Sequence, residues 1–191
     1  ETGQGLGKVG VGIYARKLME ALPLLPVEEN GRLNDLPLRE NFVLRVIAYS
    51  RWQAIQAEGL TVAALQEFHR RHKFLLLAHN QSIYRQLGPL VADTLSDNLE
   101  KSADEYIRRF MDALKKPANP KNHRNTLMHI QGFFKDHLEK QDRAQLSKVI
   151  EDYSNGLLPL LVPLEMLAMF LKKYQVDYLL DQYYFDPYPR D

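Results

Sequence analysis

Cysteine is absent from the 191 residues of this sequence. Without a thiol, the chain cannot form disulfides, and it cannot supply thiolate ligands to zinc or to an iron–sulfur cluster. A cysteine nucleophile is excluded for the same reason. The absence fits a reducing compartment, and the first ten residues, ETGQGLGKVG, lack the apolar segment of a secretory signal. We therefore expect a cytoplasmic protein.

Long apolar runs are also absent. The most apolar stretch, GLLPLLVPLEMLAMFL at residues 156–171, contains Pro159, Pro163 and Glu165. It is shorter than the roughly 20 residues that a membrane-spanning helix requires. We interpret it as a buried helix and expect no membrane contact. The overall composition, 45% hydrophobic and 26% charged, is that of a globular domain.

An excess of charge of one sign is lacking overall, because the net charge is only +1. The distribution of charge along the chain is nevertheless uneven. Residues 61–125 carry 11 basic and 7 acidic side chains, whereas residues 126–191 carry 7 and 10. A polyanion such as a nucleic acid would therefore be attracted to the middle third of the chain.

Helical periodicity dominates the chain after residue 35, and residues 13–22 form the one helix predicted before it. Asp35 is expected to cap a helix that ends at Gly59, and Thr61 to cap a second helix that stops near Asn80. One long amphipathic helix is predicted at residues 88–116. Further helices are predicted at about 121–138, 142–153, 158–174 and 176–184.

The fold prediction is therefore all-α, a bundle of about seven to eight helices after a short irregular glycine-rich N-terminal segment. In that segment, Gly5, Gly7 and Gly10 formally spell the dinucleotide fingerprint G-x-G-x-x-G, but no βαβ pattern surrounds them. We interpret them as a flexible segment. The apolar positions at helical spacing are Leu38, Phe42, Val46, Tyr49 and Ile55 on the helix after Asp35, and Leu95, Leu99, Tyr106, Phe110 and Leu114 on the long helix.

The stretch HRRHKFLLLAHN, residues 69–80, raises the question of a metal site because it holds three histidines. His79 lies seven residues from His72, which is about 10.5 Å along a helix, too far for ligands of one zinc ion. A site on His69 and His72 would need a distant third ligand, for which His123 and His129 are the candidates. We expect instead that buried His72 and His79 make hydrogen bonds that orient this helix.

The polar end of the same helix predicts a nucleic-acid contact. Arginine and lysine neutralise phosphates, and the planes of arginine, histidine and tyrosine stack on exposed bases. The alternative is an ordinary solvated charged surface. The candidate RNA-binding residues are His69, Arg70, Arg71, His72, Lys73, Tyr84, Arg85, Lys121, His123 and Arg124.

Four separated motifs resemble the YbgA-like domain, an all-helical family of unknown function. They are FHRRHKFLLLAHNQSIYRQLGPLVA, HRNTLMHIQGFFKDHL, LSKVIEDYSNGLLPLLVPLEML and YLLDQYYFDPYP, and the resemblance covers about residues 60–191. It adds His79, Asn125, His129 and Lys135 as signature positions of the family. Ser154 departs from the pattern, because family members usually have arginine there.

Residues 10–52 are similar to the C-terminal end of a thiouracil-desulfidase-like domain, which often precedes a YbgA-like domain in one polypeptide. The resemblance divides the chain into residues 1–59, a remnant of that domain with a linking helix, and residues 60–191. It implies a parent protein that holds an iron–sulfur cluster on cysteines in its N-terminal part and removes sulfur from 4-thiouridine in tRNA. Because this chain has no cysteine, we expect it to hold no cofactor and not to be catalytic alone.

The leading functional prediction is an RNA-binding accessory domain, with tRNA as the RNA and the desulfidase-like domain as a partner in the same polypeptide. One alternative is a histidine-based enzyme, with or without a metal ion, around His69, His72 and His129. Another is a helical protein-interaction module. In that case GIYARKLMEALPLLPV, residues 12–27, would leave apolar surface exposed and favour a homodimer.

Overall fold

The computed structural model describes residues 13–188, and all regular structure in this part is helical. The prediction of an all-α fold is confirmed: the described residues form eight α-helices of nine or more residues, one short α-helix and one 3-10 helix. In chain order they are α1 (Ile13–Ala21), the 3-10 helix η1 (Asn30–Asn34), α2 (Leu36–Glu58), α3 (Val62–His79), α4 (Gln81–Ala92), α5 (Leu99–Ala113), α6 (Pro120–Gly132), α7 (Lys140–Ser154), α8 (Leu161–Tyr174) and α9 (Asp177–Leu180).

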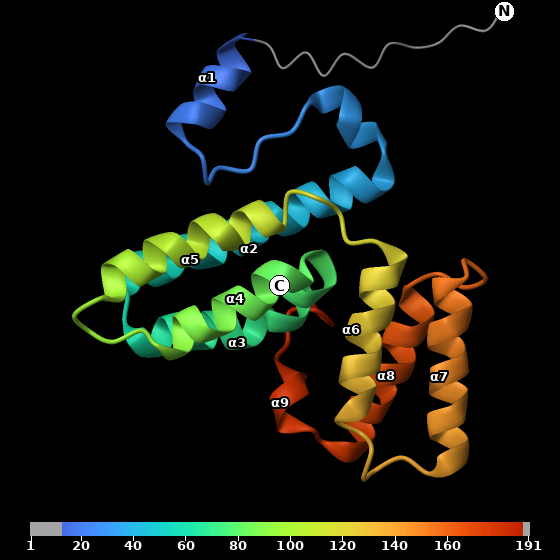
Figure 1. Cartoon of the computed structure of the whole chain (residues 1–191). Helices are drawn as coiled ribbons and strands as arrows, with labels where there is room; N and C mark the ends of the chain where they lie inside the picture. The colour runs from blue at the N-terminus through green and yellow to red at the C-terminus, as the bar shows by residue number, and fades with distance from the viewer. Residues whose placement is uncertain (1–12, 189–191) are drawn as a thin grey trace, which may run out of the picture.

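The helices form two groups that share α3 (Figure 1). Helices α2, α3, α4 and α5 surround one apolar core, and α6, α7, α8 and α9 surround a second. Leu75 and Leu76 of α3 belong to the first core, whereas Phe74, Leu77 and Ala78 belong to the second. This double role explains why the FLLLA stretch is apolar on every side of its helix.

Local capping signals set several helix ends, as the sequence predicted for Asp35 and Thr61. The side chains of Asp35, Thr61 and Asn119 accept hydrogen bonds from backbone N–H groups in the first turns of α2, α3 and α6. Asn80 ends α3 and caps α4 in the same way. Gly59 follows α2 with φ 99°, a conformation that side chains with a Cβ rarely adopt.

The predicted single helix at residues 88–116 is wrong, because α4 ends at Ala92 and α5 begins at Leu99. Side chains in the intervening turn bond to nearby backbone and compete with the helix. Asn98 Oδ1 accepts from the N–H of Leu95, and Thr94 Oγ1 donates to the carbonyl of Leu90. Leu95 is consequently 64% exposed. Leu99 is partly buried, whereas Tyr106, Phe110 and Leu114 are fully buried in the first core, as predicted.

Two predicted helices are shorter in the structure. The helix expected at 121–138 ends at Gly132 and is followed by turns, and the one expected at 176–184 is the four-residue α9. The residues after α6 form turns with local backbone hydrogen bonds, and the Arg143 side chain of α7 donates to the carbonyls of Lys135 and Leu138. After α9, the N–H of Tyr183 donates to the carbonyl of Arg71 on α3, and Gln182 Nε2 donates to the carbonyl of Arg70. Contacts with other segments therefore hold the residues where the two longer helices were predicted.

The side chains that α2 buries are not the apolar side chains that the sequence predicted for this helix. Asn41, Arg45, Ala48 and Trp52 are buried, whereas Val46 is 41% exposed. The two polar residues on this face differ in their partners. The side-chain amide of Asn41 donates to the backbone carbonyl at the end of α5, whereas Nε of Arg45 is buried without a hydrogen-bond partner among the described residues. Ala48 and Trp52 join the core of α3–α5, so α2 packs as part of that group. The division at residue 59 stays a prediction.

The N-terminal helix is where it was predicted, at residues 13–21, and the glycines of the G-x-G-x-x-G pattern lie outside the described residues. Over residues 13–188, none of the helices is long and apolar enough to span a lipid bilayer.

Candidate nucleic-acid interface

The C-terminal segment engages two of the predicted arginines. Arg70 forms ion pairs with Glu67 on its own helix and with Asp181, which follows α9. The hydrogen bond to Glu67, which has the larger effect, and the hydrogen bond to Asp181 raise the pKa of Arg70. Arg71 Nε donates to the backbone carbonyl of Asp181 at 3.2 Å. Both guanidinium groups are therefore already committed to contacts that dock the C-terminal segment on α3.

Tyr183 extends the same docking contact. Its ring contacts two guanidinium groups, with the Cζ atoms of Arg51 and Arg71 at 3.4 Å and 4.2 Å from the ring centre. The Tyr183 N–H donates to the carbonyl of Arg71, and Arg51 donates to the carbonyl of Pro187. Sequence reasoning missed Arg51 and Tyr183. The only signal in the sequence was the large number of aromatic residues in YLLDQYYFDPYP. This segment has no helical periodicity, so the sequence does not indicate which helix it packs against.

His72 is a core residue. Its ring is fully buried, packs on Phe68 with ring centres 4.0 Å apart, and its Nδ1 donates to the carbonyl of Phe68 at 2.8 Å. Burial lowers the pKa of His72 to about 3, so the ring is neutral at pH 7. The structure thus places this predicted RNA contact out of reach of any large ligand.

His79 makes the orienting bonds that were predicted. Its Nδ1 lies 2.8 Å from the carbonyl of Leu75, and its Nε2 lies 3.1 Å from Oδ1 of Asn41 on α2. His123 is held in a similar way, because its Nδ1 lies 2.9 Å from the hydroxyl of Tyr184. Burial is the main cause that lowers the pKa of His123 to about 4, and the nearby His79 lowers it further. These groups lie along a groove of about 640 Å³ whose other walls are mostly leucine and proline.

The remaining predicted positions lie on α6 or just after it. Lys121 and His129 are exposed, Asn125 is partly buried, and Lys135 is exposed beside Asp136 in the following turn. Arg124 forms an ion pair with Glu151 of α7 at 2.7 Å. The structure does not bring these side chains to the cavity that lies between α3, α4 and α9.

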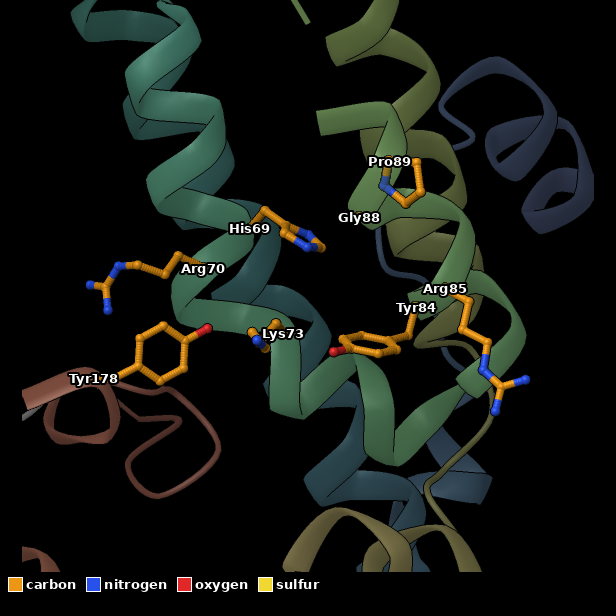
Figure 2. A pocket seen from close by; sticks show the side chains of 8 residues that line it. All are labelled: His69, Arg70, Lys73, Tyr84, Arg85, Gly88, Pro89 and Tyr178. Atoms are coloured by element: carbon orange, nitrogen blue, oxygen red, sulfur yellow. The ribbon is translucent and has the colours of Figure 1, made fainter. Parts of the chain in front are cut away.

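A cavity of about 390 Å³ lies between α3, α4 and α9. Its walls are formed by His69, Arg70, Lys73, Tyr84, Arg85, Gly88, Pro89 and Tyr178 (Figure 2). Five of these are predicted RNA-binding residues, and the structure brings them together because Asn80 connects α3 and α4 as a tight helical hairpin. Residues of α3 before that cap then face residues of α4 after it.

Figure 2 shows how the side chains are arranged. His69 points from α3 toward Gly88 on α4, and the hydroxyl of Tyr84 points toward Lys73, whereas Arg70 and Arg85 extend to the two outer sides. The Lys73 ammonium lies 4.9 Å from the centre of the Tyr178 ring. The cavity therefore combines two tyrosine rings with cationic groups, which suits an anionic ligand that contains a ring.

Two features of α4 leave one wall of the cavity open. Gly88 has no side chain, and a Cβ added there would meet no atom within 4 Å. Pro89 lies inside the helix and has no N–H, so the carbonyl of Arg85, four residues earlier, lacks its usual helical donor. This carbonyl can accept a hydrogen bond from a ligand.

The metal-assisted alternative finds no constellation of ligands. Among residues 13–188, no group of three or more histidine, aspartate or glutamate side chains could hold a metal ion. The three histidines proposed for such a site differ in setting: His72 is fully buried and bonded within α3, His69 lines the cavity, and His129 is exposed on α6.

Comparison with known proteins supports the motif-based resemblance. A family model described as "protein of unknown function (DUF1722)" matches residues 73–189. The uncharacterized protein YbgA of Escherichia coli (strain K12) is 38% identical over 152 residues, which cover 79% of this chain and 90% of that protein. No solved structure matches. The chain belongs to the DUF1722 family, which confirms the YbgA-like part of the resemblance.

Proposed function

We propose that this domain binds RNA, with tRNA as the leading candidate, at the surface around the cavity between α3 and α4. One observation carries the proposal: two helices bring five of the predicted RNA-binding residues to a single open cavity that also contains Tyr178. Tyrosine faces that stack on bases, next to cations that neutralise phosphates, are the usual combination for single-stranded nucleic acid.

The ion pairs indicate which cations are available to RNA. Arg70 is satisfied by two carboxylates, and Arg71 by the C-terminal segment. Neither Lys73 nor Arg85 forms an ion pair with a described residue, and Arg85 is exposed. We therefore assign the phosphate contacts to Lys73 and Arg85, and a structural role to Arg70 and Arg71.

The proposal also includes a place in a larger protein. Residues 10–52 are similar to the end of a thiouracil-desulfidase-like domain, and the present chain has no cysteine for an iron–sulfur cluster. In this proposal the helical domain presents tRNA to a desulfidase-like domain of the same polypeptide and is not catalytic alone. The cluster would be held by cysteines of that other domain.

Arg85→Ala is expected to weaken tRNA binding about tenfold at low salt and to reduce the slope of log K against log salt concentration by about one, because one phosphate contact is lost. Gel retardation over a series of salt concentrations measures both. Arg39→Ala, which removes the same charge from an exposed position on α2, is the matched control and should change little. Absence of any salt-dependent retardation of tRNA, or equal losses in the two variants, would contradict the proposal.

A second candidate function, self-association, is favoured by apolar side chains at the N-terminal end of the described residues. Ile13 and Leu22 are 79% and 50% exposed, and Leu25 is exposed as well. Contiguous apolar surface commonly marks an interaction site, and these three exposed side chains lie close together in sequence. The partner in this proposal is a second copy of the chain.

Sedimentation velocity at high protein concentration is expected to show a dimer, and Leu22→Ser is expected to shift it to monomer. Leu157→Ser replaces another exposed leucine, in the turn between α7 and α8, and should leave the dimer unchanged. A wild-type chain that stays monomeric at every concentration would exclude self-association.

A further inference from the structure

We infer that the cavity between α3 and α4 accepts one unpaired nucleotide, and that His69 is the neutral hydrogen-bond donor that contacts it. Tyr106 is the positioning residue that sets this donor. The inference rests on the proposed RNA-binding function and names the part of the RNA that enters the cavity. It also extends to a free mononucleotide, which carries the same chemical groups.

The hydrogen bond between His69 and Tyr106 determines which ring nitrogen carries the proton. Tyr106 is fully buried, and the one partner of its hydroxyl among the described residues is Nδ1 of His69, at 3.2 Å. If Nδ1 carried the proton, the buried O–H of Tyr106 would have no acceptor, which is unfavourable. The phenol therefore donates to Nδ1, and the proton of the neutral imidazole is on Nε2.

The Nε2–H group is open to the cavity. His69 lines the cavity, and Figure 2 shows its ring extending from α3 toward Gly88 on the opposite helix. Among the described residues, Nε2 has no hydrogen-bond partner and is not one of the buried polar atoms without one. Burial is the main cause that lowers the pKa of His69 to about 4, and the positive charge of Lys73 has a smaller effect in the same direction. At pH 7 the ring consequently offers a neutral donor to an oxygen acceptor.

The other two histidines of α3 differ from His69. Nε2 of His72 also lacks a partner among the described residues, but it is fully buried, so no ligand can reach it. Both ring nitrogens of His79 lie close to protein oxygen atoms, at 2.8 Å and 3.1 Å. His69 uses only one of its nitrogens for the fold. The second nitrogen, aimed into a cavity with tyrosine rings and a lysine, is available to a ligand.

The size and walls of the cavity fit one nucleotide. Its volume of about 390 Å³ is in the range of sites for small ligands and cofactors. The Tyr84 ring offers a face for a base, and the Lys73 ammonium offers a charge for a phosphate. On the side of α4, Gly88 leaves space for close approach, and the carbonyl of Arg85 can accept from an N–H of a base.

Nitrogen-15 NMR of the whole chain tests the donor directly. The wild-type spectrum is expected to show His69 as the Nε2–H tautomer, and Tyr106→Phe is expected to increase the Nδ1–H tautomer. Titration with AMP, GMP, CMP and UMP is expected to shift the signals of His69 and Tyr84, and inorganic phosphate alone is not. A structural role for Tyr106 would change stability but would leave the tautomer as it was.

Three substitutions separate the donor from the fold. His69→Asn keeps an acceptor for Tyr106 near the Nδ1 position but removes the Nε2–H donor, and is expected to weaken mononucleotide and tRNA binding about tenfold. His69→Gln places an amide N–H near the Nε2 position and is expected to restore part of the affinity. His129→Gln on α6 is the control and should not change binding. None of the three should change the salt dependence of tRNA binding.

The outcomes distinguish this inference from the proposed function. If tRNA binds with the expected salt dependence but mononucleotides do not bind and His69→Asn has no effect, RNA binding stands and the nucleotide pocket is excluded. If mononucleotides shift His69 and Tyr84 while tRNA is not retarded, the pocket stands and the RNA function fails. Detection of the Nδ1–H tautomer in the wild type, or equal shifts with inorganic phosphate, would overturn the inference.

Discussion

Phe68→Ala is expected to lower the free energy of unfolding by about 3 to 5 kcal/mol, the range for removal of a large buried ring. Phe68 is 3% exposed, and its ring centre lies 5.2 Å from that of Trp52 and 5.3 Å from that of Phe110. It also stacks on His72 at 4.0 Å. Since these rings come from α2, α3 and α5, the cavity left by the substitution would loosen three helices together.

Urea denaturation followed by circular dichroism measures this loss. Phe133→Ala is the matched control, because Phe133 is 39% exposed and stacks mainly on Tyr178, with ring centres 5.4 Å apart. Its substitution is expected to lower the free energy of unfolding by only about 1 kcal/mol. Similar losses in the two variants would show that Phe68 is not the centre of the α2–α5 core.

Lowering the pH from 6.5 to about 4 is expected to reduce the free energy of unfolding by several kcal/mol. Burial lowers the pKa of His69 and His123 from 6.5 to about 4 and that of His72 to about 3. One pKa unit corresponds to about 1.4 kcal/mol for each group. The unfolded chain therefore takes up protons in this range, whereas the folded chain would have to bury the charged imidazolium away from water.

The direction of the effect follows from proton linkage. Because the folded pKa values lie below the unfolded value, the stability is fully present above pH 6.5 and falls as the pH drops toward the folded values. Glu67 and Asp181 add to acid sensitivity, since hydrogen bonds from Arg70 lower the pKa of each carboxyl. Their contribution is lost only below the unfolded values of 4.5 and 3.8, so the histidines dominate between pH 6.5 and 5.

Urea midpoints measured at intervals from pH 7.5 to 4 test this expectation. His72→Gln removes one titrating group and is expected to flatten the dependence of unfolding free energy on pH, by up to about 1.4 kcal/mol per pH unit. His129→Gln removes an exposed histidine and should leave the slope unchanged. A constant unfolding free energy between pH 7 and pH 5 would contradict the buried neutral state of these histidines.

Local signals in the sequence predicted most helix positions. The caps at Asp35, Thr61 and Asn119 act within three residues along the chain, so no tertiary information is needed to recognise them. The same local reasoning failed at residues 93–98. There, the periodicity of the apolar residues continued across the turn, while Thr94 and Asn98 bonded to nearby backbone and ended the helical pattern.

The sequence by itself determined the all-α class, the YbgA-like family motifs, the caps, and the burial of the FLLLA stretch, because each depends on composition or on neighbours within a few residues. Only the tertiary structure decided which basic side chains are available. Asp181 and Tyr183 lie more than a hundred residues from Arg70 and Arg71, and no periodic pattern reveals that they pair. The cavity depends on the same level of structure: Tyr84 and Gly88 meet Lys73 and His69 only when α4 folds back on α3.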